Sequence, residues 1–95
     1  MRILIAEDDL VSRKFLGKVL SKYGEFDMVV EGLEAIDAYM ISIKENNPYV
    51  LICLDIIMLK VDGVKVLKTI RDTEFQKETP LNQKVKIISN FKITF

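Results

Sequence analysis

The chain has few of the residues on which most metal and covalent catalytic sites depend. Its 95 residues include no histidine and a single cysteine, Cys53. One cysteine excludes an internal disulfide framework, and without histidine there is no basis for a zinc site or for Ser-His or Cys-His catalysis. The scarcity of cysteine favours a reducing compartment, so a cytoplasmic location is expected. Cys53 itself is predicted to be a small buried apolar residue rather than a reactive thiol.

Excess charge and long apolar runs are also missing. Fourteen basic residues balance fourteen acidic ones, which gives no basis for direct binding of nucleic acid or of an anionic membrane. The longest apolar run, residues 49–54, is the length of a strand and too short for a signal-peptide core or a membrane span. With 49% hydrophobic and 29% charged residues, we expect one compact soluble domain over residues 1–95.

Short apolar runs alternate along the chain with segments of helical period. Strands are predicted at residues 3–6, 26–30, 50–54 and 85–88,. The intervening segments are predicted to form helices at about residues 10–23, 33–45 and 62–71, with Gly24 as a C-terminal cap of the first,. This order predicts an α/β fold, a doubly wound parallel sheet with right-handed crossovers and helices on both faces.

Some segments have weaker patterns. In the first helix, Val11, Phe15 and Val19 recur every four residues and predict one wide stripe facing the core,. Residues 72–84 are polar and predict a frayed helix end plus a loop. The methionines are expected in or near the core, namely Met28, Met40 and Met58. Residues 91–95 alternate like a half-buried strand, which pairs either with the fourth strand or with a partner's sheet.

Acidic side chains follow two of the predicted strands. Glu7 and Asp8, with Asp9 next, come after the first strand, and Asp55 comes after the third. Ligands of doubly wound sheets gather at the carboxyl ends of the strands. Each acid alone also fits a helix cap or a solvated strand end. If the two strands are neighbours, however, the carboxylates converge, and a cation must offset their repulsion.

The chemistry of these oxygen ligands points to Mg²⁺, because histidine and additional cysteines are absent. A carboxylate beside Mg²⁺ can attack phosphorus in line and give an acyl phosphate. Asp55 is the better nucleophile candidate, since it ends the most apolar strand alone. The acidic pair after the first strand is better suited to holding the metal.

At these residues the chain resembles the receiver domain of two-component response regulators. Residues 2–9, RILIAEDD, are similar to the first strand and acidic pair of that family, and residues 54–63, LDIIMLKVDG, to its phosphoacceptor strand end and following loop. Residues 64–71 are similar to its third helix. The resemblance covers residues 2 to about 89 and implies a flavodoxin-like receiver fold, truncated after the fourth strand.

The resemblance also implies roles for single residues. Asp55 would be the phosphoacceptor, Asp8 would bind Mg²⁺ directly, and Glu7 would help through water. The main-chain carbonyl of Ile57 would be a further ligand, and Ser89 is a weak candidate for sensing the phosphoryl group. The donor would be a phosphohistidine on a sensor histidine kinase or phosphotransfer protein, or a small acyl phosphate. Such a module is not an enzyme in the usual sense.

The chain departs from the family pattern at several places. Leu59 stands where the family usually has proline, and Asn90 stands at the usual Ser or Thr position. The lysine that closes the family's fifth strand has no counterpart, and neither do the last helices. A domain with these parts missing exposes a sheet edge and apolar helix flanks. We therefore expect a homodimer or a strand-exchanged assembly.

Other functions remain open at this point. The first alternative is a degenerate receiver that is not phosphorylated and acts only in association. A Mg²⁺-dependent phosphohydrolase of the haloacid-dehalogenase type is disfavoured, because Ile57 stands where that family has a second aspartate. Nucleotide binding through a phosphate loop is disfavoured as well, since no glycine-rich loop follows any strand.

Overall fold

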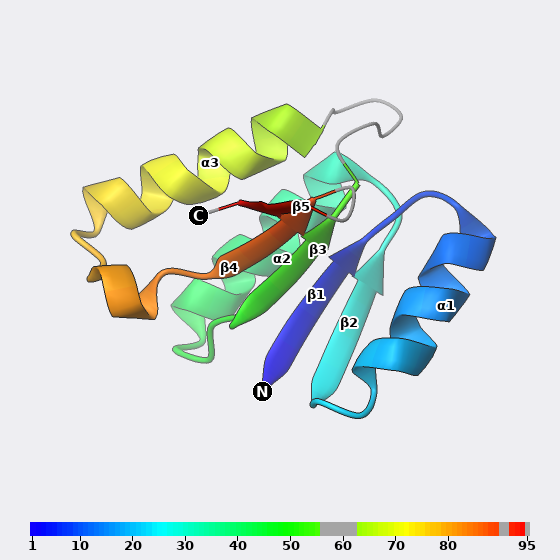
Figure 1. The fold of residues 1–95 in the computed structure, drawn as a ribbon. Helices are drawn as coiled ribbons and strands as arrows, with labels where there is room; N and C mark the ends of the chain where they lie inside the picture. Colours follow the sequence, from blue (N-terminus) through cyan, green and yellow to red (C-terminus); the bar gives the residue numbers. More distant parts are fainter. Residues whose placement is uncertain (56–62, 90–91, 95) are drawn as a thin grey trace.

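The computed structural model describes residues 1–55, 63–89 and 92–94, which form one twisted sheet with helices on both faces (Figure 1). The elements are β1 (Arg2–Ala6), α1 (Leu10–Leu20), β2 (Glu25–Val29), α2 (Gly32–Lys44), β3 (Leu51–Leu54), α3 (Gly63–Gln76), a 3-10 turn (Leu81–Gln83), β4 (Lys86–Ser89) and β5 (Lys92–Thr94). The strand order is β2-β1-β3-β4-β5. Strands β1 to β4 are parallel. The doubly wound α/β fold predicted from the sequence is confirmed.

The central strands are those with uninterrupted apolar sequence. Ile3, Leu4, Ile5 and Ala6 of β1 are fully buried, because this strand has a neighbour on each side and helices above and below. Strand β2 lies at the edge and is only partly buried. The register pairs Ala6 with Leu54 of β3. The residues that follow these two strands therefore leave the sheet side by side.

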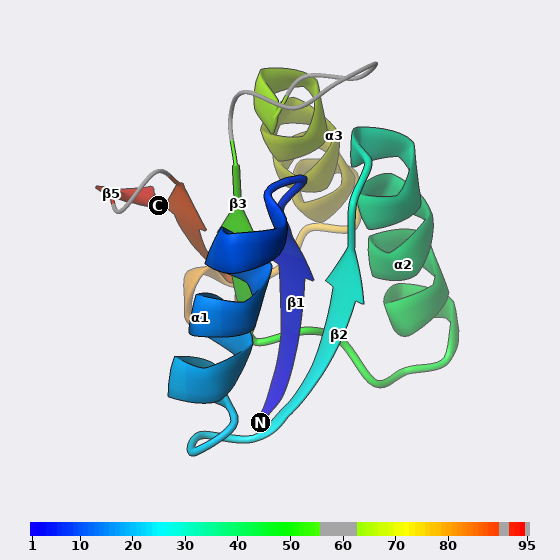
Figure 2. The ribbon, with the colours of Figure 1, turned by 90° about the vertical axis from the view of Figure 1, so that its right-hand side faces the viewer.

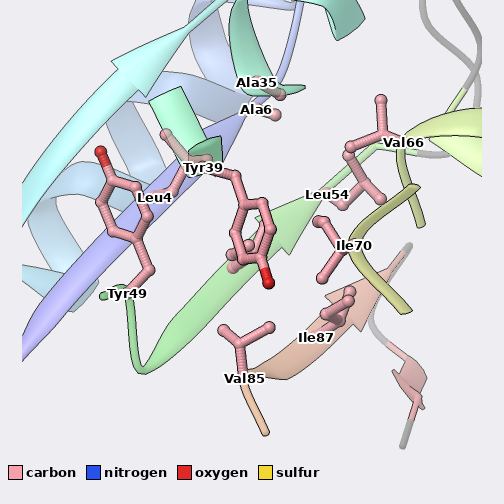
Figure 3. Packing of buried hydrophobic residues seen from close by; sticks show 11 residues of the cluster. Leu4, Ala6, Ala35, Tyr39, Tyr49, Leu54, Val66, Ile70, Val85 and Ile87 are labelled. Atoms are coloured by element: carbon pink, nitrogen blue, oxygen red, sulfur yellow. The ribbon is translucent and has the colours of Figure 1, made fainter. Parts of the chain in front are cut away.

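The two faces of the sheet are covered unequally (Figure 2). Helices α2 and α3 cover one face, where Leu4, Ile52, Ile70 and Ile87 belong to the larger apolar cluster (Figure 3). Helix α1 covers the other face over a smaller cluster of Ile3, Ile5 and Cys53. Figure 2 shows α1 as the only described helix on that side.

Only one side of the apolar stripe of α1 therefore faces the core. Leu16 and Leu20 pack on the smaller cluster, but Val11 is 74% exposed, Phe15 59% and Val19 40%. The prediction that all of these residues face the core is wrong, because a single helix cannot bury two sides of itself against one sheet.

Other expectations are decided by burial. Cys53 is 6% exposed, so its prediction as a buried residue is confirmed, and this burial raises the pKa of its thiol to about 11. Met28 and Met40 are exposed instead of lying in the core, while Met58 lies outside the described residues. None of the helices within the described ranges is long and apolar enough to cross a membrane.

The end of α3 is anchored to the start of β4 by a buried carboxylate. Glu74 is 4% exposed, and its Oε2 accepts a hydrogen bond of 2.8 Å from the Val85 backbone N–H. Arg71 Nη1 donates to Glu74 Oε1 at 2.6 Å and to the Val85 carbonyl at 2.9 Å. The predicted fraying from residue 72 is therefore wrong, since α3 continues to Gln76 and has a fixed last turn.

The final strand resolves an alternative that the sequence left open. Strand β5 runs antiparallel to β4, with Ile93 opposite Ile88. The segment thus pairs within its own chain, and the outer edge of β4 is covered by a three-residue strand.

A tight approach of the backbone at Gly24 gives a first test of the fold. Gly24 has φ +158°, and a Cβ atom there would lie 2.0 Å from the carbonyl oxygen of Met1. We expect Gly24→Ala to lower the free energy of unfolding by about 1–3 kcal/mol, because the backbone itself must move. Gly17→Ala is the matched control, since its Cβ would meet only the flexible end of Met28 within 3 Å. Urea unfolding measures the free energy of unfolding of both variants. An equal loss of stability in Gly24→Ala and Gly17→Ala would contradict the close approach of the Gly24 and Met1 backbones.

Candidate functional site

The carboxyl ends of β1 and β3 bring the candidate acids together. The Asp55 backbone N–H donates to the Ala6 carbonyl at 2.9 Å, which continues the pairing of the two strands by one residue. The Glu7 N–H donates to the Val29 carbonyl of β2 at 3.1 Å. Both acids therefore start from backbone positions that the sheet fixes.

Three carboxylates converge at this edge. Oxygen atoms of Glu7, Asp8 and Asp55 lie within 4.8 Å of one another, and all three residues are half-buried. At such a separation two negative charges repel by roughly 3 kcal/mol at an effective dielectric constant of about 20. The structure thus brings together the acids that the sequence singled out, in an arrangement that favours a bound cation.

The close approach of the acids affects the pKa of Glu7. Partial burial raises the pKa of Glu7, and the charges of Asp55 and Asp8 add to the increase. The Asp9 backbone N–H, which donates to Glu7 Oε1 at 3.1 Å, acts in the opposite direction. Ionising Glu7 is therefore harder in the folded chain than in the unfolded one, so its negative charge lowers stability at neutral pH.

The loop that carries the acids is held by the first turn of α1. Asp9 is the N-cap of this helix, and its Oδ2 accepts a hydrogen bond of 2.8 Å from the Ser12 N–H. Arg13 Nη1 donates to the main-chain carbonyls of Glu7 and Asp8, both at 3.0 Å. Sequence reasoning missed Arg13. Its position in the first turn of the helix that follows the acids could have indicated that the Arg13 side chain reaches their backbone carbonyls.

The other two predicted site residues have different outcomes. Ile57, with its carbonyl, lies outside the described residues. Ser89 is 4% exposed at the end of β4 and pairs in register with Leu54. Strand alternation places Ser89 on the same face as Ile87, which belongs to the cluster under α2 and α3,. It is not one of the three converging residues, and its sensing role stays a prediction.

The chemistry available to this edge of the sheet follows from its donor atoms. Three carboxylates without histidine or cysteine ligands are a donor set that suits a hard cation such as Mg²⁺,. A carboxylate in such a site can also act as a nucleophile, since a bound cation would neutralise the charge of an approaching anionic group. Asp55 follows an apolar strand and lies beside two further acids, so it is the candidate for both roles.

Comparison with known proteins identifies the family of the chain. Residues 3–89 match the family described as the response regulator receiver domain. The chain is 38% identical over 80 residues to the transcription factor SKN7 of Saccharomyces cerevisiae, which covers 83% of this chain and 12% of that protein. It is 35% identical over 91 residues to the chemotaxis protein CheY of Treponema pallidum, which covers 93% of this chain and 56% of CheY. The chain thus spans at most about half the length of these relatives.

Solved structures give the same result. The chain superimposes with a TM-score of 0.73 and 26% identity on a chain in the complex of the S. cerevisiae phosphotransfer protein Ypd1 with the receiver domain of Ssk1, covering 94% of this chain and 61% of that one. The receiver domain of the Arabidopsis thaliana histidine kinase CKI1, complexed with Mg²⁺ and BeF₃⁻, has the same fold, with a TM-score of 0.76, 24% identity and coverage of 93% and 63%. By family match, sequence identity and fold, the chain belongs to the response regulator receiver domain family.

Proposed function

We propose that this domain accepts a phosphoryl group on Asp55 with the help of Mg²⁺, as part of a two-component phosphorelay. The observation that carries the proposal is the convergence of Glu7, Asp8 and Asp55 within 4.8 Å at the ends of two adjacent strands. Membership of the receiver family supports it, because the matched residues include all three acids.

The donor set fits Mg²⁺. Asp8 and Asp55 would bind the ion directly, Glu7 through water, and the carbonyl of Ile57 would complete the protein ligands. The ion would neutralise charge on the phosphoryl oxygens and on the carboxylates themselves. The CKI1 receiver, of the same fold, was crystallised with Mg²⁺, which supports a site of this kind here.

The chain's own residues have separate tasks in the transfer. A carboxylate oxygen of Asp55 forms the new O–P bond, and the bond from phosphorus to the donor, N–P in phosphohistidine, breaks as its electron pair leaves with the imidazole. Arg13 holds the carbonyls of Glu7 and Asp8 and so fixes the loop from which the metal-binding side chains project. Accurate placement of these groups supplies much of the rate.

The partner would be a protein that carries phosphohistidine. One structural relative is the receiver of Ssk1 in complex with the phosphotransfer protein Ypd1, which supports a phosphotransfer protein or a sensor histidine kinase as donor. The domain would thus assist its own modification without acting as an enzyme on a separate substrate. We also propose a cytoplasmic location, no direct contact with nucleic acid or membrane, and association into homodimers.

Phosphoryl transfer from a small donor tests the proposal. We expect the chain, incubated with acetyl phosphate and Mg²⁺, to gain the mass of one phosphoryl group, with peptide mapping placing it on Asp55. Chelation of Mg²⁺ should prevent the gain, because the carboxylates then repel the incoming anion. A folded chain that is never modified, while an intact receiver is modified in parallel, would favour the alternative of a degenerate receiver that acts only in association.

A further inference from the structure

The starts of β3 and β4 border a cavity of about 430 Å³, at the end of the sheet opposite to the converging acids. Val50 and Val85, which precede these two strands, lie in its wall. Val50 comes five residues before Asp55, which corresponds to about 16 Å along a strand. Helices α2 and α3 and the 3-10 turn also contribute to the wall. The cavity is therefore separate from the proposed phosphoacceptor site, and its chemistry does not depend on that of Asp55.

The wall of this cavity contains a buried tyrosine hydroxyl. Tyr39 lines the cavity and is only 2% exposed. Figure 3 shows its hydroxyl directed to the side on which Val85 lies. Within the described part of the chain, the hydroxyl makes no hydrogen bond. Since tyrosine hydroxyls usually have a hydrogen-bond partner when they are buried, this one calls for a partner inside the cavity.

The hydroxyl of Tyr39 is available as a donor. Burial raises the pKa of Tyr39 to about 12, and the charge of Glu74 adds to the increase, while Arg71 opposes it. The hydroxyl therefore keeps its proton at neutral pH. Both oxygens of Glu74 already accept hydrogen bonds, Oε1 from Arg71 and Oε2 from the Val85 N–H. The interior of the cavity thus offers a neutral donor, which suits an acceptor oxygen of a ligand.

The rim of the cavity is basic. Lys77 and Lys84 line it, and both are exposed. Neither forms an ion pair with a described residue. Glu74, the acid among the described lining residues, is already paired with Arg71. Much of the remaining wall is apolar, with the side chains of Ile43, Pro48, Tyr49, Val50 and Val85.

We propose that this cavity binds a small aromatic carboxylate that carries an acceptor oxygen at the far end of its ring. The carboxylate lies at the rim beside Lys77 and Lys84. The ring packs on Pro48 and Tyr49, whose own flat rings are part of the wall,. The acceptor oxygen receives the hydrogen bond of the Tyr39 hydroxyl. The size of the cavity is in the range of about 300–1,000 Å³ that is typical of small-molecule sites.

Titration of the ¹⁵N-labelled chain with 4-acetylbenzoate, followed by NMR, tests the site. This probe has a carboxylate at one end of a ring and a ketone oxygen at the other. We expect a dissociation constant of about 0.1–1 mM, with the largest amide shifts at residues 77–85. No saturable shift up to about 10 mM, or shifts centred on another part of the fold, would overturn the proposal.

Tyr39→Phe tests the donor, because it removes the hydroxyl and keeps the ring. We expect this variant to bind 4-acetylbenzoate about fivefold more weakly. The comparison probe is 4-isopropylbenzoate, which has the same shape without the acceptor, and its affinity should change by less than about twofold. Circular dichroism checks that the variant is folded. An equal change in affinity for the two probes would show that the Tyr39 hydroxyl does not contact the ketone and would overturn the proposal.

Charge substitutions test the orientation of the ligand. The double variant Lys77→Gln, Lys84→Gln should weaken binding of both probes by about threefold or more, since both carry a carboxylate. Lys68→Gln is the matched control, because Lys68 is exposed on α3 and does not line the cavity. If Lys68→Gln weakens binding as much as the double variant does, the carboxylate is attracted only by the general charge of the chain, and the proposed orientation is wrong.

Discussion

Asp55→Asn is expected to abolish phosphoryl incorporation from acetyl phosphate and, at the same time, to stabilise the metal-free fold. The amide oxygen is a poor nucleophile, so the O–P bond does not form. Removing one charge from three carboxylates within 4.8 Å relieves repulsion. Because these groups are half-buried, solvent screening reduces the gain to about 1 kcal/mol, or a rise of about 4–8 °C in Tm.

The two effects are measured on the same protein samples. Intact-mass analysis follows modification, and thermal unfolding in the presence of a chelator follows stability. Asp37→Asn, on the exposed surface of α2, is the control and should change neither quantity. Added Mg²⁺ should raise the Tm of the wild type more than that of Asp55→Asn, because only the complete site binds the ion well. An Asp55→Asn variant that is still modified, or that is less stable without metal, would contradict the assignment of the site.

Glu74→Ala is expected to lower the free energy of unfolding by about 3 kcal/mol, the largest loss that we expect from a single substitution. The Val85 N–H donates to Glu74 Oε2 in a buried position, and alanine would leave this donor without its acceptor. Arg71, whose Nη1 now contacts Glu74 Oε1 at 2.6 Å, would lose its carboxylate partner as well. The last turn of α3 would then separate more easily from β4.

Two further substitutions separate the causes of this loss. Glu74→Gln keeps an oxygen for the Val85 N–H but removes the charge facing Arg71, so a loss of about half the size is expected. Asp72→Ala, an exposed position of the same helix, should change stability by less than about 0.5 kcal/mol. Urea unfolding of the three variants gives the comparison. If Glu74→Ala and Asp72→Ala lower the free energy of unfolding by the same amount, the contacts of Glu74 with Val85 and Arg71 do not stabilise the fold more than an exposed side chain does.

The sequence predicts the acidic cluster because two simple rules combine there. The runs before Glu7 and Asp55 are apolar throughout, which is typical of buried parallel strands, and such strands end at one edge of a sheet. Neither rule requires knowledge of which side chains pack together in the folded chain. The fold follows from the same reasoning, since alternating strands and helices leave few topologies for a short chain.

Contacts that depend on packing could not be predicted in the same way. Glu74 lies in a polar stretch that predicts a loop, and its burial becomes clear only when Val85 is placed beside the helix. Phe15 has the spacing of a core residue, yet it is exposed because α1 has no neighbouring helix among the described elements. Periodicity tells which residues share a side of a helix, but not how many sides the fold covers.

The place of β1 between β2 and β3 bears on how the domain folds during synthesis. When residues 2–6 leave the ribosome, neither of the strands that flank them yet exists, since these lie at residues 25–29 and 51–54. At translation rates of about 5–20 residues per second, β2 follows β1 after about 1–5 s and β3 after about 2–10 s, so one edge of β1 stays unpaired until β3 has been made,.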